Sequence, residues 1–102
     1  MTKLSHVTTV SPGQHLTSLN ASSWKSECLM RLTSETQLLS VDLETCEFVD
    51  SSGIGSMMGV WKECMKRGVQ MELRNVPAPF RKQLALIKLD QVLTVNEYLA
   101  EA

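Results

Sequence analysis

The sequence has few of the residues from which metal centres and disulfide frameworks are built. Its 102 residues include three cysteines and two histidines. Cys28, Cys46 and Cys64 lie too far apart to form a CxxC pair, and neither His6 nor His15 is at metal-ligand spacing from a cysteine. An odd number of widely spaced cysteines is typical of reduced thiols in a cytoplasmic protein. We therefore expect no disulfide, no metal and no cofactor.

Long apolar runs and blocks of one charge are also absent. No apolar run approaches the ~20 residues that a membrane-spanning helix needs, and the start MTKLSHVTTVSPG does not have the pattern of a signal peptide. The formal charge is -1, from 10 basic and 11 acidic residues, with neither sign clustered. These absences predict a soluble, cytoplasmic protein that binds no nucleic acid and has no direct membrane insertion. The length predicts one domain, residues 1–102, with a buried core.

The hydrophobic pattern predicts strands that alternate with helices. The predicted strands are 3–10, 37–44, 69–76 and 92–95, with a weak edge strand at 14–19. Helices are predicted after Asn20, over 52–67 and from Pro79, with a final helical turn over 96–102. Gly68 follows two basic residues and is the expected left-handed residue after the second helix. The order predicts an α/β fold, with a parallel or mixed sheet and about four helices packed on it.

The helix predicted over 52–67 has two different faces. Helical spacing places its large apolar residues in one arc, which we expect to face the core: Ile54, Met57, Met58, Trp61, Cys64 and Met65. The other side carries small and charged residues: Ser52, Gly55, Ser56, Gly59, Lys62, Glu63 and Lys66. A glycine inside a helix costs about 1 kcal/mol relative to alanine, so an exposed Gly59 indicates that something approaches closely. We interpret this smooth side as a partner-binding surface, with Gly55, Ser56, Gly59 and Glu63 as its contact residues.

An acid, two hydroxyls and a glycine, Asp50 to Gly53, stand at the start of this helix. A helix N-terminus has unpaired N–H groups and partial positive charge, so it favours anions. One serine, Ser51 or Ser52, is expected to cap the helix, which leaves the other hydroxyl free and Asp50 unexplained. The helix end would tolerate a phosphate, whereas a docked partner would not. The pattern therefore indicates a phosphorylation switch.

Two catalytic alternatives fit the sequence less well. Gly53, Gly55 and Gly59, with Glu72 further on, come near a dinucleotide-binding fingerprint. However, the polar Asp50 to Ser52 step separates them from the strand, and the chain leaves little room for a cofactor and a substrate. A serine hydrolase would need a nucleophile motif such as G-x-S-x-G and a suitably placed histidine, and the sequence has neither. We expect the protein not to be an enzyme.

The segment FVDSSGIG, with the helix after it, the strand GVQMEL and the helix VPAPFRKQLALIKLD, resembles the STAS domain of bacterial anti-sigma-factor antagonists. The resemblance covers about residues 13–95 and implies a small mixed sheet with helices mainly on one face. It also implies that Ser51 is the phosphoacceptor, with Asp50, Ser52 and Gly53 as its neighbours. The implied partners are an anti-sigma or switch serine kinase and a PP2C-type phosphatase. The family often has an aspartate in the loop before the first helix, about where Thr17 stands here.

STAS domains have a second role that remains open for this sequence. Some resemble a cytoplasmic accessory subunit of ABC-type lipid transporters, which binds the ATPase without a phosphorylation cycle. The intact pair of Asp50 and Ser51 favours the phosphorylation switch. Neighbouring genes would distinguish the two hypotheses, because one predicts a kinase and a phosphatase and the other predicts an ATPase and a permease.

Overall fold

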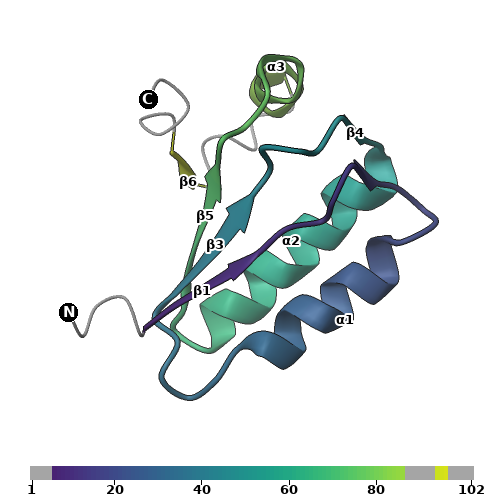
Figure 1. Ribbon diagram of the computed structural model, residues 1–102. Helices are drawn as coiled ribbons and strands as arrows, with labels where there is room; N and C mark the ends of the chain where they lie inside the picture. Colours follow the sequence, from purple (N-terminus) through teal and green to yellow (C-terminus); the bar gives the residue numbers. More distant parts are fainter. Residues whose placement is uncertain (1–5, 87–93, 97–102) are drawn as a thin grey trace.

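The protein is described here by a computed structural model, which describes residues 6–86 and 94–96 (Figure 1). Strands and helices alternate along most of the chain, as the sequence predicts. In chain order the elements are β1 (Val7–Val10), β2 (His15–Leu16), α1 (Ala21–Arg31), β3 (Leu38–Asp42), β4 (Phe48–Val49), α2 (Ser51–Lys66), β5 (Gln70–Arg74), α3 (Ala78–Leu86) and β6 (Thr94–Asn96).

The main sheet has the strand order β1-β3-β5-β6, and all three of its pairings are parallel. The short strands β2 and β4 form a separate parallel pair. The hydrophobic pattern left a parallel or a mixed sheet open and the resemblance implies a mixed one, but the strands described are all parallel. Parallel neighbours require a crossover connection, and α1, α2 and α3 each lie in one of these connections.

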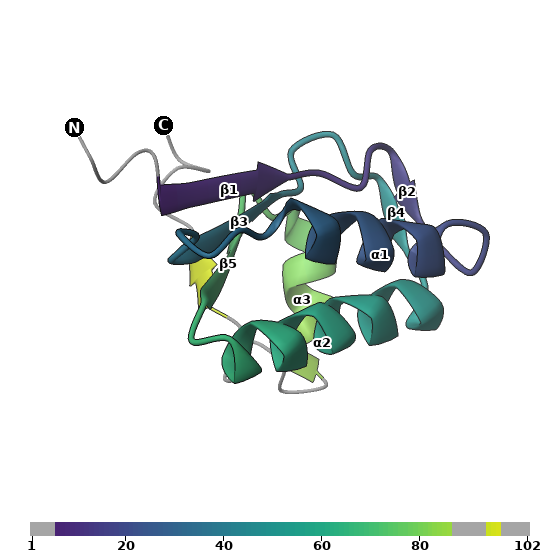
Figure 2. The same ribbon diagram turned by 90° about the horizontal axis from the view of Figure 1, so that it is seen from below.

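Both long helices cover the same face of the sheet, as the resemblance implies. Figures 1 and 2 show α1 and α2 side by side below β1, β3 and β5, while α3 lies near the end at which β3 and β5 finish. Three helices lie within the described residues. The fourth, expected over 96–102, lies outside them except for Asn96, which belongs to β6.

The C-terminal end of α2 follows the sequence closely. Gly68 has φ +72, its N–H donates to the carbonyl of Met65 at 3.2 Å, and the N–H of Val69 donates to the carbonyl of Cys64 at 2.8 Å. This pair of bonds is a Schellman motif, which ends α2 and turns the chain into β5. Asn20 stands at the N-cap position of α1 but makes no capping bond.

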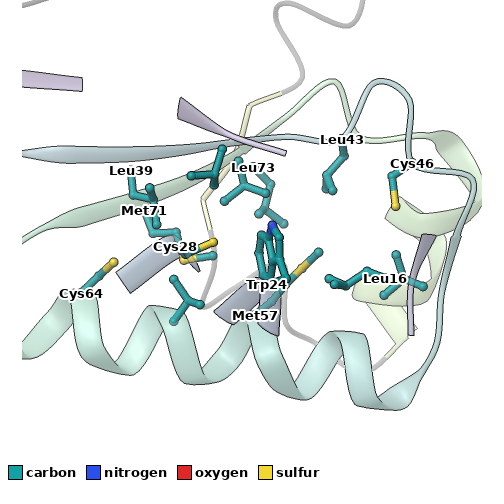
Figure 3. Close-up of a cluster of buried hydrophobic side chains, with 14 of the residues drawn as sticks. Leu16, Trp24, Cys28, Leu39, Leu43, Cys46, Met57, Cys64, Met71 and Leu73 are labelled. Atoms are coloured by element: carbon teal, nitrogen blue, oxygen red, sulfur yellow. The ribbon is translucent and has the colours of Figure 1, made fainter. Parts of the chain in front are cut away.

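The core lies between the sheet and the two long helices (Figure 3). Alternate residues of β3 and β5 point into it, and both helices contribute to it: Leu39, Val41, Met71, Leu73, Trp24, Cys28, Met57, Val60 and Cys64. The buried side of α2 is rotated about the helix axis relative to the apolar arc that the sequence predicts. Val60 is completely buried whereas Met65 is 61% exposed, because α1 packs along one side of α2 and draws that side inward.

All three cysteines are buried and free. Burial raises the pKa of Cys28 to about 12, with smaller contributions from Glu27 and from the thiol of Cys64. Burial also raises the pKa of Cys46 and of Cys64. These thiols are therefore protonated near neutral pH and are poor nucleophiles.

The pKa of Cys28 predicts how stability depends on pH. The unfolded thiol ionises near pH ~8.5, so stability due to this group is complete below that pH and decreases as the pH rises toward 12. Each pH unit in this window costs about 1.4 kcal/mol. Urea denaturation from pH 7 to 10 should show a steeper loss for the wild type than for Cys28→Ala. Equal slopes of stability against pH for the two proteins would contradict the raised pKa of Cys28.

Candidate functional site

The residue that caps α2 is Asp50. Its backbone is extended, with φ -99 and ψ -174, and its Oδ1 accepts a hydrogen bond from the N–H of Gly53 at 2.9 Å. The expectation that Ser51 or Ser52 caps the helix is therefore wrong. Aspartate, serine and threonine are all good N-caps, and the helix begins one residue earlier than expected, which moves the cap from serine to aspartate.

The second oxygen of Asp50 holds the loop between β2 and α1. Oδ2 accepts a hydrogen bond from the N–H of Ser18 at 3.2 Å, and the N–H of Asp50 donates to the carbonyl of Leu16 at 3.2 Å. The hydroxyl of Thr17 makes no hydrogen bond to Asp50 and instead accepts one from the N–H of Leu19. Asp50 thus has a structural role that the sequence did not indicate: it joins two segments that are distant in sequence.

Ser51 is the first residue of α2, and both Ser51 and Ser52 are exposed. Within the described residues, neither hydroxyl has a hydrogen-bond partner, and the backbone N–H groups of both residues are also free. These two N–H groups and the partial positive charge of the helix end can receive an anion. The first turn carries no acidic side chain.

Gly53 is the most tightly packed glycine of the site. A Cβ at this position would overlap the carbonyl oxygen of Leu16 and would lie 2.8 Å from Cγ1 of Val49. Real Cβ atoms do not approach backbone so closely, so only glycine lets β2 and β4 pack directly against the first turn of α2. Gly55 differs, because nothing lies within 4 Å of a Cβ built there.

The smooth side expected on α2 is only partly exposed. Ser56 is 8% exposed, and its Oγ donates a hydrogen bond to the carbonyl of Gly53 at 2.7 Å, so the expectation that it is exposed is wrong. Gly59 is half-buried, since the side chain of Lys25 lies over it and would be 2.9 Å from a Cβ. The close approach that its glycine suggested is made by α1.

Glu63 is engaged in a local ion pair. Its Oε2 accepts from Nε of Arg67 at 3.2 Å, one helical turn away. Such exposed pairs contribute about 0.3–0.5 kcal/mol, so the pair does not prevent contact with a partner. Its role in partner binding, and that of Gly55, remain predictions.

Other kinds of site are not found in the described part of the chain. Residues 6–86 and 94–96 contain no group of histidine, cysteine, aspartate or glutamate side chains that could hold a metal ion. In the same residues, no helix is long and apolar enough to cross a membrane. The candidate site is the exposed start of α2, where the hydroxyls and N–H groups of Ser51 and Ser52 have no partner among the described residues.

A family model for the STAS domain matches residues 1–102. The chain belongs to the STAS domain family. No curated protein matches the sequence. Solved structures with the STAS fold of this chain include a putative anti-sigma factor antagonist from Thermotoga maritima, with TM-score 0.81, 19% identity, and coverage of 94% of this chain and 83% of that chain.

Two further solved structures share the fold with this STAS domain. One is a sulfate transporter family protein from Wolinella succinogenes, with TM-score 0.76, 17% identity, and coverage of 88% of this chain and 75% of that chain. The other is the anti-sigma factor antagonist SpoIIAA in its unphosphorylated form, with TM-score 0.59, 18% identity, and coverage of 85% and 89%. At these identities the similarity establishes the fold alone.

Two glycines of the site provide a matched pair of substitutions. Gly53→Ala should destabilise the protein strongly, because its methyl group meets backbone. The methyl group of Gly55→Ala would have no atom within 4 Å, so this change should stabilise the helix by up to about 1 kcal/mol, the difference in helix propensity. Urea denaturation monitored by circular dichroism measures both changes. A Gly53→Ala protein as stable as the wild type would contradict the packing described.

Substitution of Asp50 should show its double role. Asp50→Ala loses the bonds to Gly53 and Ser18, and we expect a cost of about 2 kcal/mol, at the upper end for a lost cap. Asp50→Ser can keep only the capping bond, so it should cost less. Amide hydrogen exchange of Ser18 should accelerate in both variants. Unchanged exchange at Ser18 would show that Asp50 does not hold this loop.

Proposed function

We propose that this STAS domain is a regulatory binding protein of the anti-sigma-factor-antagonist type, and not an enzyme. It binds a serine kinase or anti-sigma partner in the cytoplasm while Ser51 is unphosphorylated. The kinase phosphorylates Ser51, which releases the partner, and a PP2C-type phosphatase restores the original state. The observation that carries the proposal is that Asp50 caps α2, which leaves the exposed hydroxyl of Ser51 without a role in the fold.

The electrostatics at the start of α2 support the proposal that the fold tolerates a phosphate on Ser51. A phosphoserine adds about -1.5 to -2 charge, and at this end of a helix negative charge is favourable by about 0.3–1 kcal/mol. The free N–H groups of Ser51 and Ser52 can donate to it. The carboxylate of Asp50 already accepts from two N–H groups, so the phosphate does not have to displace a bond that holds the fold.

A partner that covers the start of α2 would lose affinity on phosphorylation. Ser51, Ser52 and Gly55 are exposed together on the first turns, so a docked surface would have to remove water from the dianion. A loss of ~2.7 kcal/mol would weaken binding about a hundredfold. The neighbour SpoIIAA is an anti-sigma factor antagonist described by its phosphorylation state, which supports this type of control.

The tolerance of the fold can be tested without knowing the partner. Phosphoserine introduced at position 51 should leave the thermal midpoint within a few degrees of the wild type. Phosphoserine at position 56 is the matched control, because this side chain is buried and donates to the carbonyl of Gly53, and it should unfold the start of α2. Comparable destabilisation at both positions would contradict a phosphate site at Ser51.

The switch itself is tested with a serine kinase that binds this chain. After incubation with that kinase and ATP, mass spectrometry should locate one phosphate on Ser51. Ser51→Ala should bind the kinase constitutively, Ser51→Asp should bind it weakly, and Ser52→Ala should behave as the wild type. If the phosphate is elsewhere, or if Ser51→Ala and Ser51→Asp bind equally, the switch is wrong. The ABC-transporter accessory subunit, which needs no phosphorylation cycle, then takes its place.

A further inference from the structure

A groove adjoins the helix start, between the β3–α2 connection and α3. It has a volume of about 690 Å³, and its lining residues come from two parts of the chain: Glu44, Cys46, Glu47, Phe48, Val49 and Asp50 on one side, and Pro77, Pro79, Phe80 and Gln83 on the other. Ser51 is not among the residues that line it. The groove is therefore a neighbour of the proposed phosphorylation site, with residues of its own.

The floor of this groove is apolar and one wall is an exposed aromatic ring. Cys46, Val49 and Phe80 are buried beneath it, whereas Phe48 is 56% exposed. Covering so exposed a phenylalanine with an apolar group is favourable, by roughly 25 cal/mol per Å² of apolar surface removed from water. The two prolines add further apolar surface. The groove is thus suited to an apolar side chain.

The charge of the groove is of one sign. Glu44, Glu47 and Asp50 line it, and no lysine or arginine does so among the described residues. Glu44 and Glu47 are exposed, and their carboxylates have no partner in the described part of the chain. Carboxylates of this kind attract a cation and repel an acidic segment. An occupant that fits the groove must therefore combine positive charge with apolar surface.

The walls of the groove are held in place by hydrogen bonds. The N–H of Glu47 donates to the carbonyl of Gln14 at 2.7 Å. After β5, Asn75 adopts a left-handed backbone, with φ 55, and its Nδ2 donates to Oδ1 of Asp42 at 3.1 Å. Because both connections are fixed in this way, a partner does not have to order them when it binds.

We propose that this groove binds a short segment of a partner protein in which arginine or lysine alternates with apolar residues. The apolar side chains would cover the exposed ring of Phe48, and the cations would pair with Glu44, Glu47 and Asp50. The inference rests on the proposed function only in treating the chain as a partner-binding domain. Since Ser51 does not line the groove, this contact would not depend on phosphorylation of Ser51, and the release proposed above would act through the partner's contacts at the start of α2.

The test uses fluorescein-labelled peptides and the full chain. The peptide GRLRFRG should bind and shift the amide NMR signals of Glu47, Phe48 and Phe80, whereas GELEFEG, with reversed charge, and GRSRSRG, without apolar residues, should bind at least about tenfold more weakly. The combined substitution Glu44→Lys and Glu47→Lys should weaken GRLRFRG at least tenfold. Glu35→Lys is the matched control, because Glu35 is an exposed carboxylate before β3, at its opposite end, and it should have little effect.

Each alternative outcome has a definite meaning. The inference is overturned if GRLRFRG does not bind at millimolar concentration, if GELEFEG or GRSRSRG binds as well, if Glu35→Lys weakens binding equally, or if the shifted signals lie outside the groove. Ser51→Ala and Ser51→Asp should bind GRLRFRG equally. If they do so while the phosphorylation experiment fails, the groove stands and the switch falls. If GRLRFRG fails while Ser51 is phosphorylated by its kinase, the reverse holds.

Discussion

The arrangement of the site depends on the carboxylate of Asp50. One oxygen holds the start of α2 and the other holds the loop before α1. Without this side chain, the start of α2 and the segment of β2 and its following loop would still be joined by the backbone bond between Asp50 and Leu16 and by packing around Gly53, but the side-chain bond to the loop would be lost. Asp50 thus caps the start of α2 and holds the loop before α1, so the side chains of Ser51 and Ser52 remain exposed and unbonded within the part of the chain that the structure describes.

Much of the fold could be predicted from periodicity, since α2 was expected over 52–67 and occupies Ser51–Lys66. The strand β4 was missed because two residues give no pattern to detect. The parallel pairing was left open because alternation predicts a strand but not the direction of its neighbour. The final strand was expected over 92–95 and is found at Thr94–Asn96, while the residues before it, 87–93, lie outside the described chain.

The site was harder to predict, because neighbouring residues compete for the same position. Aspartate and serine both cap helices well, so the sequence did not reveal that Asp50 would take the cap and release Ser51. The smooth side of α2 was misjudged for a different reason. Its small residues make room for the Lys25 side chain and for a side-chain-to-backbone bond of Ser56, and a helical wheel does not show which neighbouring helix lies on which side. The groove beside Phe48 combines two distant segments, so no local pattern indicates it.

The parallel order of the strands has a consequence for how this surface can change over time. Because β3 and β5 run in the same direction, the connections that leave them meet at one edge, and Figure 1 shows α3 and β4 gathered there. The exposed residues that line the groove, among them Glu44, Glu47 and Phe48, lie in these connections, whereas its buried residues Cys46, Val49 and Phe80 also belong to the core. Substitutions of the exposed residues can therefore alter what the edge recognises and leave the core intact. Duplicated copies of such a domain can acquire different binding preferences while they keep one scaffold.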